Sequence, residues 1–249
     1  MPAPVINFFV TLLYWGWFTF GFLLIFSWRY FGCALLAKGS ETCFQRLNSR
    51  FLQVLFQLIR RTAPNQKWEI DSEAAAIRSA VIVCNHVSYL DPLLLISLFE
   101  RQRTIVKPRF FAMPIFGRVI TKSGYFPASS EGRFAGLMVR QMESMQDFFA
   151  GGGNLFVFPE GTRSRDGRIG ELNQGAMKIA RLHKVPIYVL RIANTDRLFT
   201  PGTFLFQTRA NNTISLKILA RIEPDYRHHI PSAAALQQQV MEIYQANQP

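Results

Sequence analysis

A histidine and an aspartate five positions apart, His86 and Asp91, are the residues of this chain best suited to chemistry. They follow the apolar run 80–84, which is typical of a buried strand, and α/β proteins place catalytic groups where such strands end. Histidine exchanges a proton near neutral pH, and a nearby carboxylate fixes its tautomer and stabilises the imidazolium. We therefore predict that His86 is a general base and Asp91 its orienting partner. Asp91 also precedes Pro92 and a Leu-rich segment, so a helix N-cap is the competing role.

A second polar run stands at residues 158–164, with the sequence FPEGTRS. It also follows an apolar, strand-like stretch, at residues 154–157. The His-x4-Asp spacing alone recurs by chance in many chains, so the second run adds weight to it. Between them the two runs supply a base, two carboxylates and a guanidinium.

Together the two runs resemble the signature motifs of the glycerolipid acyltransferase family, which includes the 1-acyl-glycerol-3-phosphate acyltransferases. The family's N-H-x-S-x-x-D motif is met by Asn85, His86, Ser88 and Asp91, and its F-P-E-G-T-R-S motif is met throughout 158–164. The resemblance extends over roughly residues 78–192. It implies direct transfer of a fatty acyl group from a thioester donor to a lysolipid hydroxyl. No bound cofactor is implied, and the co-substrate is acyl-CoA or acyl-carrier protein.

Such a reaction needs a base for the hydroxyl, stabilisation of the developing oxyanion and a hold on the anionic acceptor. Arg163 is the predicted phosphate ligand, because its planar fork suits phosphate oxygens. Glu160 either orients Arg163 or binds the acceptor's free hydroxyl, and the N–H of Gly161 helps to hold an anion. Thr162 completes this predicted substrate-binding run. The alternative is a structural turn with a surface salt bridge.

Other residues near the motifs receive supporting roles. Asn85 and Ser88 are predicted to shape the turn around His86. Ser88 is not a nucleophile, because no G-x-S-x-G elbow is present. Residues 107–117 are similar to the family's K-x-x-L/F-x-x-x-P-x-x-G stretch, which makes Lys107 a second phosphate contact.

The sequence departs from the family pattern at residues 124–130, where G-x-I/F-x-x-D-R is common. Ser129 and Ser130 stand in place of the Asp and the Arg. The resemblance implies that this Arg helps to bind the acceptor phosphate, so another lysolipid is the alternative acceptor. Arg133 is a candidate replacement. Two arginines extend the positive charge after the second run: Arg165 and Arg168.

The first sixty residues have the composition of a membrane anchor. No charged side chain stands between Val5 and Trp28, and a helix of that length reaches about 36 Å, enough for a hydrocarbon core of roughly 30 Å. We predict membrane-anchoring helices over 1–62 and a catalytic domain over 63–249. The basic segment after Trp28 faces the cytoplasm by the positive-inside tendency. Residues 42–61 predict an amphipathic helix, on the membrane or on the catalytic domain. A buried core helix is the alternative for the first run, and no cleaved signal peptide is expected.

The net charge of +12 raises nucleic-acid binding as a function class. No recognisable nucleic-acid module is present, and anionic lipid headgroups explain the charge more simply. Membrane lipids, and no nucleic acid, are therefore the expected partners. Three scattered cysteines without a C-x-x-C predict neither a disulfide framework nor a zinc site, and no metal is expected.

The remaining chain alternates strand-like and helix-like segments, which predicts an α/β fold with a mixed sheet flanked by helices. By its resemblance to the glycerolipid acyltransferases, the sequence is identified as a membrane-associated acyltransferase of phospholipid synthesis, acting on 1-acyl-sn-glycerol-3-phosphate. A non-catalytic lipid-binding protein and a thioester hydrolase remain alternatives. The expected strands are 80–84, 103–107, 124–127, 154–158, 186–191 and 213–222, and the expected helices are 91–100, 113–122, 131–149, 171–183 and 232–246.

Overall fold

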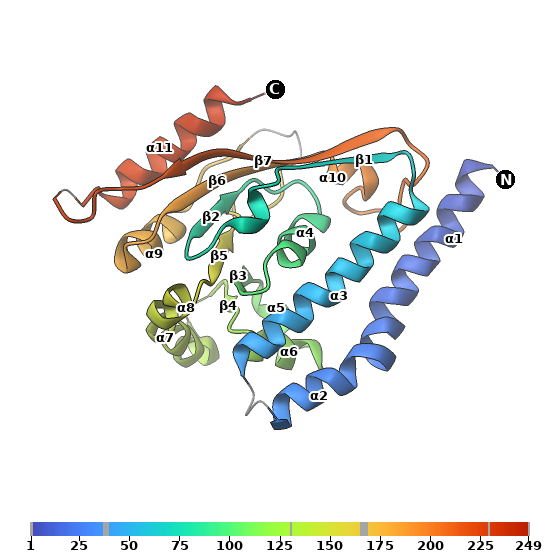
Figure 1. Ribbon diagram of the computed structural model, residues 1–249, viewed down its shortest axis with the longest axis horizontal. Helices are drawn as coiled ribbons and strands as arrows, with labels where there is room; N and C mark the ends of the chain where they lie inside the picture. The colour runs from blue at the N-terminus through green and yellow to red at the C-terminus, as the bar shows by residue number, and fades with distance from the viewer. Residues whose placement is uncertain (1, 37–39, 130, 165–168, 229, 249) are drawn as a thin grey trace.

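The computed structural model describes residues 2–36, 40–129, 131–164, 169–228 and 230–248, and in this part a seven-stranded sheet lies between helices (Figure 1). The strand order is β1-β7-β6-β2-β5-β3-β4. Neighbouring strands are parallel, except for the antiparallel pair β6 and β7. The predicted mixed sheet flanked by helices is confirmed. The strands are β1 (Gln66–Ile70), β2 (Val81–Cys84), β3 (Gln102–Val106), β4 (Phe126–Pro127), β5 (Asn154–Val157), β6 (Ile187–Ala193) and β7 (Asn212–Ile222).

The helices lie where they were predicted, but several begin or end at other residues than expected. The predicted helix 113–122 begins only at Phe116, after Ile115 takes a positive φ of 62°. The predicted helix 131–149 is interrupted at Ser144, whose hydroxyl accepts a hydrogen bond from the buried Arg103 guanidinium. Strand β1 was not predicted, because its sequence QKWEI carries two charges in five residues. The helices of this part are η2 (Ala74–Ala76), α4 (Leu90–Leu98), α5 (Pro108–Phe111), α6 (Phe116–Lys122), η3 (Gly132–Phe134), α7 (Ala135–Glu143), α8 (Met145–Ala150), α9 (Gly175–His183), α10 (Thr195–Leu198) and α11 (Ala233–Ala246).

Each face of the sheet carries its own apolar core, because successive side chains of a strand point to opposite faces. On β2, Ile82 and Cys84 pack in one core with α3 and α4. Val81 and Val83 pack in the other, with α8, α9 and α11. All four strand residues are fully buried. The polar turn after β2 therefore starts from a rigid, central position.

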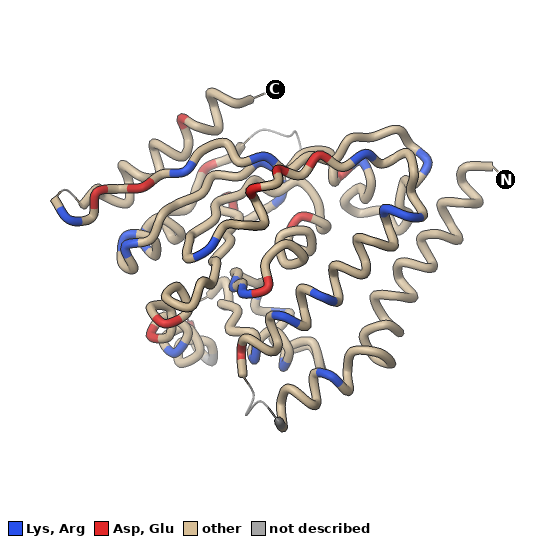
Figure 2. The backbone as a smooth tube through the Cα atoms, viewed as in Figure 1, with Lys and Arg blue, Asp and Glu red and all other residues tan. Residues whose placement is uncertain are grey.

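The N-terminal segment forms one long, bent helix, followed by a second helix that turns back beside it (Figure 1). The first consists of α1 (Ala3–Gly16), the π-helical η1 (Trp17–Phe26) and α2 (Ser27–Leu36), and the second is α3 (Glu41–Thr62). Residues 3–35 are long and apolar enough to cross a membrane, by length and composition. Figure 2 shows no charge along α1, whereas basic residues recur along α3.

Helix α3 is the predicted amphipathic helix, and its apolar side packs on the catalytic part. Phe51, Leu55 and Ile59 are buried in the same core as α4 and the sheet. Polar side chains of α3 reinforce this packing, since Gln53 donates to the carbonyl of Ser97 at the end of α4 (2.9 Å). The alternative of a helix packed on the catalytic domain is thus the arrangement seen. The division between 1–62 and 63–249 stays a prediction.

One side of α1 is polar and is bound to the loop between α10 and β7. Asn7 Oδ1 accepts from the N–H and the hydroxyl of Thr208 (3.1 and 2.7 Å). Thr11 Oγ1 accepts from the N–H of Phe206 (2.9 Å), and the Trp15 indole donates to the carbonyl of Phe204 (3.3 Å). Positions 7, 11 and 15 lie on one helix face. The opposite side exposes apolar side chains to the surroundings: Phe8, Phe9, Leu12 and Leu13.

The prediction that the cysteines form no disulfide is wrong for one pair. Cys33 on α2 and Cys43 on α3 are joined by a disulfide, with their Cα atoms 5.9 Å apart. Their spacing in the sequence gave no sign of this, because only the return of α3 beside α2 brings the thiols together. Cys84 is a buried free cysteine, as expected of a small core residue.

Candidate active site

The two polar motifs meet because the strands before them are parallel neighbours. In the β2–β5 pair, Val83 lies opposite Val157, so both strands end at the same edge of the sheet. The second motif (residues 158–164) is hydrogen-bonded to both the N–H and the carbonyl of His86. The His86 N–H donates to Glu160 Oε1 (3.1 Å), and the N–H of Ser164 donates to the His86 carbonyl (2.8 Å). The position of the predicted base therefore depends on both motifs.

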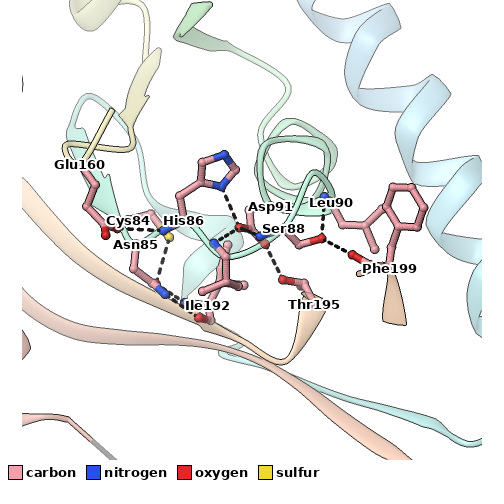
Figure 3. Close-up of polar contacts among 11 residues, drawn as sticks. Cys84, Asn85, His86, Ser88, Leu90, Asp91, Glu160, Ile192, Thr195 and Phe199 are labelled. Carbon is pink, nitrogen blue, oxygen red and sulfur yellow. Dashed lines mark hydrogen bonds and ion pairs between the residues drawn. The ribbon is translucent and has the colours of Figure 1, made fainter. Parts of the chain in front are cut away.

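The imidazole of His86 is hydrogen-bonded to Asp91 through Nδ1, at 2.9 Å from Oδ2. An ionised carboxylate only accepts hydrogen bonds, so Nδ1 carries the proton and Nε2 keeps its lone pair. Figure 3 shows the free ring nitrogen pointing away from Asp91. One ring face lies against Phe158, with centroids 4.3 Å apart. This geometry suits removal of a proton by Nε2.

The Asp91 carboxylate is fully buried and accepts four hydrogen bonds. Besides His86, Oδ2 accepts from the N–H groups of Val87 and Ser88, each at 2.7 Å. Oδ1 accepts from the hydroxyl of Thr195, at 2.5 Å (Figure 3). The competing role is wrong, because Asp91 is the second residue of α4 rather than its N-cap, and its carboxylate accepts from N–H groups that precede the helix. The same carboxylate closes the turn at the start of α4 and orients the histidine ring.

Asn85 and Ser88 shape the turn around His86, as predicted. The Asn85 amide donates to the Ile192 carbonyl (2.8 Å) and accepts from the Ile192 N–H (2.7 Å), which extends the contact of β2 with β6. The Ser88 hydroxyl donates to the carbonyl of Phe199 (3.0 Å) and accepts from the N–H of Leu90 (3.3 Å). The serine oxygen is buried and occupied, which fits a structural role rather than a nucleophile.

The second motif lines a groove of about 570 Å³, together with residues 170–173. The Arg163 guanidinium lies over the ring of Tyr89, 3.8 Å from the centroid, and its Nη2 donates to the Tyr89 hydroxyl (3.1 Å). Among the described residues its Nη1 is buried and has no hydrogen-bond partner. A buried donor without an acceptor is costly, and an anionic ligand would supply that acceptor. Arg163 is therefore the donor in this groove best prepared for a phosphate.

Glu160 binds main-chain groups rather than Arg163. Besides the His86 N–H, its carboxylate accepts from the N–H of Gly170 (3.2 Å), and the described structure holds no contact between Glu160 and Arg163. Burial raises the pKa of the Glu160 carboxyl, and the N–H groups of Gly170 and His86 offset part of that rise. Glu160 thus connects the second motif to His86 through a main-chain hydrogen bond.

The other predicted positions are placed less tightly. Gly161 has φ 67°, a conformation that favours glycine, but its N–H donates to the Phe158 carbonyl and is not free to hold an anion. Thr162 is exposed in the groove wall, and Lys107 is exposed at the start of α5. Ser129 accepts from the N–H of Glu131 (3.3 Å). Four positions lie outside what the structure describes: Ser130, Arg165, Arg168 and the side chain of Arg133.

Thr195 is a site residue that the sequence analysis missed. Thr195 comes shortly after β6, the strand that pairs with β2. Its place after a predicted strand was the one sequence feature that pointed to this residue. We expect Thr195→Val to lower the free energy of unfolding by about 1.5–3 kcal/mol, because Asp91 Oδ1 loses a hydrogen bond to a charged acceptor. A less firmly held carboxylate should lower kcat on the order of tenfold.

This prediction is checked by thermal unfolding and by initial rates. Thr195→Ser should restore both values, because it keeps the hydroxyl. Thr200→Val is the matched control, since its exposed hydroxyl donates to the Asp196 carbonyl (3.0 Å) outside the site. A Thr195→Val protein with wild-type kcat would show that Thr195 is structural only.

A sequence model of the acyltransferase family matches residues 67–193, slightly more than half of the chain. A chloroplast 1-acyl-sn-glycerol-3-phosphate acyltransferase of Brassica napus is 32% identical over 123 residues, which are 49% of this chain and 35% of that protein. A probable 1-acyl-sn-glycerol-3-phosphate acyltransferase of Mycoplasma pneumoniae is 31% identical over 132 residues, which are 51% of this chain and 48% of that protein.

The similarity in fold extends further than the similarity in sequence. The crystal structure of the 1-acyl-sn-glycerophosphate acyltransferase PlsC from Thermotoga maritima superposes with a TM-score of 0.69 at 19% identity, covering 98% of this chain and 95% of that one. The matches to the two curated relatives span only about a third and a half of their lengths. The N-terminal helices are therefore shared with a known fold, while the sequence match is confined to the part that carries the motifs.

Proposed function

The chain belongs to the acyltransferase family, and from this premise we propose that it transfers a fatty acyl group from a thioester donor to the free hydroxyl of 1-acyl-sn-glycerol-3-phosphate. The observation that carries the proposal is the His86–Asp91 pair, in which His86 Nε2 is free. The His86 N–H is hydrogen-bonded to Glu160, which lines the same groove as Arg163. The curated relatives with this reaction in their names support the choice of acceptor.

In the proposed reaction His86 Nε2 takes the proton of the acceptor hydroxyl as its oxygen attacks the thioester carbonyl. The Asp91 carboxylate stabilises the imidazolium that forms. The tetrahedral intermediate then collapses to the ester and releases the donor thiol, which receives the proton from the imidazolium. The chain needs no bound cofactor for these steps, and the donor is acyl-CoA or acyl-carrier protein.

The acceptor headgroup is proposed to bind in the groove of the second motif. Arg163 contacts the phosphate through its guanidinium. Lys107 does not line the described groove, and its role as a second phosphate contact rests on the resemblance of residues 107–117 to the family stretch. Glu160, Gly161 and Thr162 form the groove wall beside it. Arg163 is the cationic side chain of the described groove lining, which also holds Glu160 and Glu171, so the attraction for an anionic headgroup is local to the guanidinium.

The exposed apolar side of α1 is proposed to face membrane lipid, and the basic residues of α3 to face its anionic headgroups. The polar contacts of α1 with residues 204–208 keep that side fixed relative to the catalytic site. We place the catalytic site on the cytoplasmic face of the cell membrane, with lysolipid reaching it from that leaflet.

A second candidate is acylation of a different lysolipid. It rests on Ser129 and Ser130, which stand in place of the Asp and the Arg of the family pattern, the Arg being the residue that the resemblance assigns to the acceptor phosphate. The discriminating measurement is acyl transfer by the purified protein in lipid micelles, with lysophosphatidic acid, lysophosphatidylcholine and lysophosphatidylethanolamine as acceptors. We expect kcat/KM for lysophosphatidic acid to exceed the others by about tenfold or more, because only it carries a phosphate monoester.

A reaction without acceptor serves as the control for hydrolysis. If another lysolipid is preferred, the acceptor assignment is wrong and the family chemistry stands. Loss of the thioester to water at the same rate with and without acceptor would identify a hydrolase. Binding of lysolipid with no turnover, unchanged in His86→Ala, would identify a non-catalytic lipid-binding protein.

A further inference from the structure

We propose that Tyr89 is a positioning residue that sets acceptor selectivity by holding the phosphate-binding Arg163 at a fixed place beside the base. This inference rests on the proposed function. Tyr89 occupies a position that the N-H-x-S-x-x-D motif leaves open. Tyr89 stands between Ser88 and Asp91, on the turn that Asp91 closes. It is 46% exposed, so burial in the core does not explain its place.

Two contacts bind the Arg163 guanidinium to this one side chain. The ring covers one face of the guanidinium at 3.8 Å, and the hydroxyl accepts from Nη2 at 3.1 Å. A cation over an aromatic face and a charge-assisted hydrogen bond are both attractive, and together they restrict a side chain that otherwise has many rotamers. Arg163 forms no ion pair with any described carboxylate. Tyr89 therefore replaces the acidic partner that usually orients an arginine.

A neutral partner has a consequence for binding. A carboxylate beside Arg163 would neutralise the guanidinium and compete with an anionic ligand, whereas tyrosine orients the group and leaves its full positive charge. The buried Nη1 remains without a partner among the described residues. The arginine is thus oriented, charged and lacking one acceptor, which matches a phosphate monoester better than a neutral or zwitterionic headgroup.

The contact also links two parts of the proposed reaction. Tyr89 belongs to the turn that carries His86 and Asp91, so the distance from His86 Nε2 to the phosphate site is set within one short segment. In a 1-acyl-glycerol-3-phosphate the reacting hydroxyl and the phosphate are on adjacent carbons. Because one turn holds the base and, through Tyr89, the guanidinium, their separation is fixed, which favours an acceptor with one set spacing between hydroxyl and phosphate.

The test is a double-mutant cycle with Tyr89→Leu and Arg163→Ala, measured as the Kd for lysophosphatidic acid without donor and as KM and kcat with donor. Tyr89→Leu is expected to raise Kd and KM between about ten- and a hundredfold and to leave kcat within about twofold. In the Arg163→Ala background the same substitution should change Kd by less than about twofold, because its effect runs through the arginine. Tyr89→Phe, which keeps the ring, should fall in between.

Tyr188→Leu is the matched control, because its ring lies under Arg221 (5.5 Å) outside the groove, and it should leave Kd unchanged. An equal loss from Tyr89→Leu with and without Arg163 would overturn the inference, as would an unchanged Kd in the single variant. Kd is measured without turnover, so a failure of the proposed reaction does not mask this result. Monoacylglycerol, which lacks the phosphate, should bind wild type and Tyr89→Leu alike.

Discussion

Replacing His86 by alanine is expected to lower kcat for acyl transfer by about 10²–10⁴-fold, the usual contribution of a positioned base. The reason is that His86 Nε2 is the basic atom at the junction of the two motifs. Glu160 is occupied by two N–H groups, and Asp91 is fully buried behind the imidazole. The KM for the acceptor should change little, because the phosphate contact through Arg163 is retained. Initial rates at saturating donor and acceptor measure this effect.

Folding must be intact for that result to be informative. The His86 side chain is only 17% exposed and stacks on Phe158, so the melting temperature of the variant has to be compared with that of the wild type. His183→Ala is the matched control, since His183 on α9 contacts Gln146 (3.2 Å) outside the site. A folded His86→Ala protein with more than half of the wild-type kcat would exclude His86 as the base.

Asp91→Asn is expected to lower kcat by about 10²–10⁴-fold, the contribution of a positioned base, because the imidazolium is no longer stabilised, while the fold is kept. An asparagine oxygen at the place of Oδ2 can still accept from His86 and from the N–H groups of Val87 and Ser88. Its amide would face the Thr195 hydroxyl, which can turn and accept. The hydrogen bonds survive, but the negative charge that stabilises the imidazolium is lost.

Asp91→Ala separates the electrostatic role from the structural one. It leaves the buried N–H groups of the turn without an acceptor, at about 1–3 kcal/mol each, so it should also lower the free energy of unfolding. Denaturant titration and kcat are measured for both variants. If Asp91→Asn kept wild-type kcat, Asp91 would have a structural role only. If Asp91→Asn unfolded as readily as Asp91→Ala, the hydrogen-bond geometry argued here would be wrong.

The fold was predictable where the signal is local. Apolar runs such as 80–84 and 154–157 became β2 and β5, because a strand buried on both faces leaves a continuous apolar stretch in the sequence. Strand β1 was missed, because an edge strand alternates buried and exposed residues and carries charge. The helix over 131–149 was predicted as one piece, whereas the structure interrupts it at Ser144, where the hydroxyl accepts from Arg103, a residue distant in sequence.

The sequence by itself determined the chemical groups of the site, because both motifs are short and each stands at the end of its own strand. His86, Asp91 and Arg163 were predicted from residue type together with the resemblance of both motifs to those of the acyltransferase family. What only the tertiary structure decided are the partners of these groups. Thr195 reaches Asp91 from the end of β6, and Tyr89 reaches Arg163 from the other motif.

The same limit applied to the N-terminal helices. Their apolar composition predicted an anchor, but the contacts of Asn7 and Thr11 with the loop before β7, and the disulfide between Cys33 and Cys43, appear only in the folded chain. A side chain's type limits which bonds it can form. Which bond it does form depends on the segments that packing brings within about 3 Å of it, and spacing along the chain does not encode that.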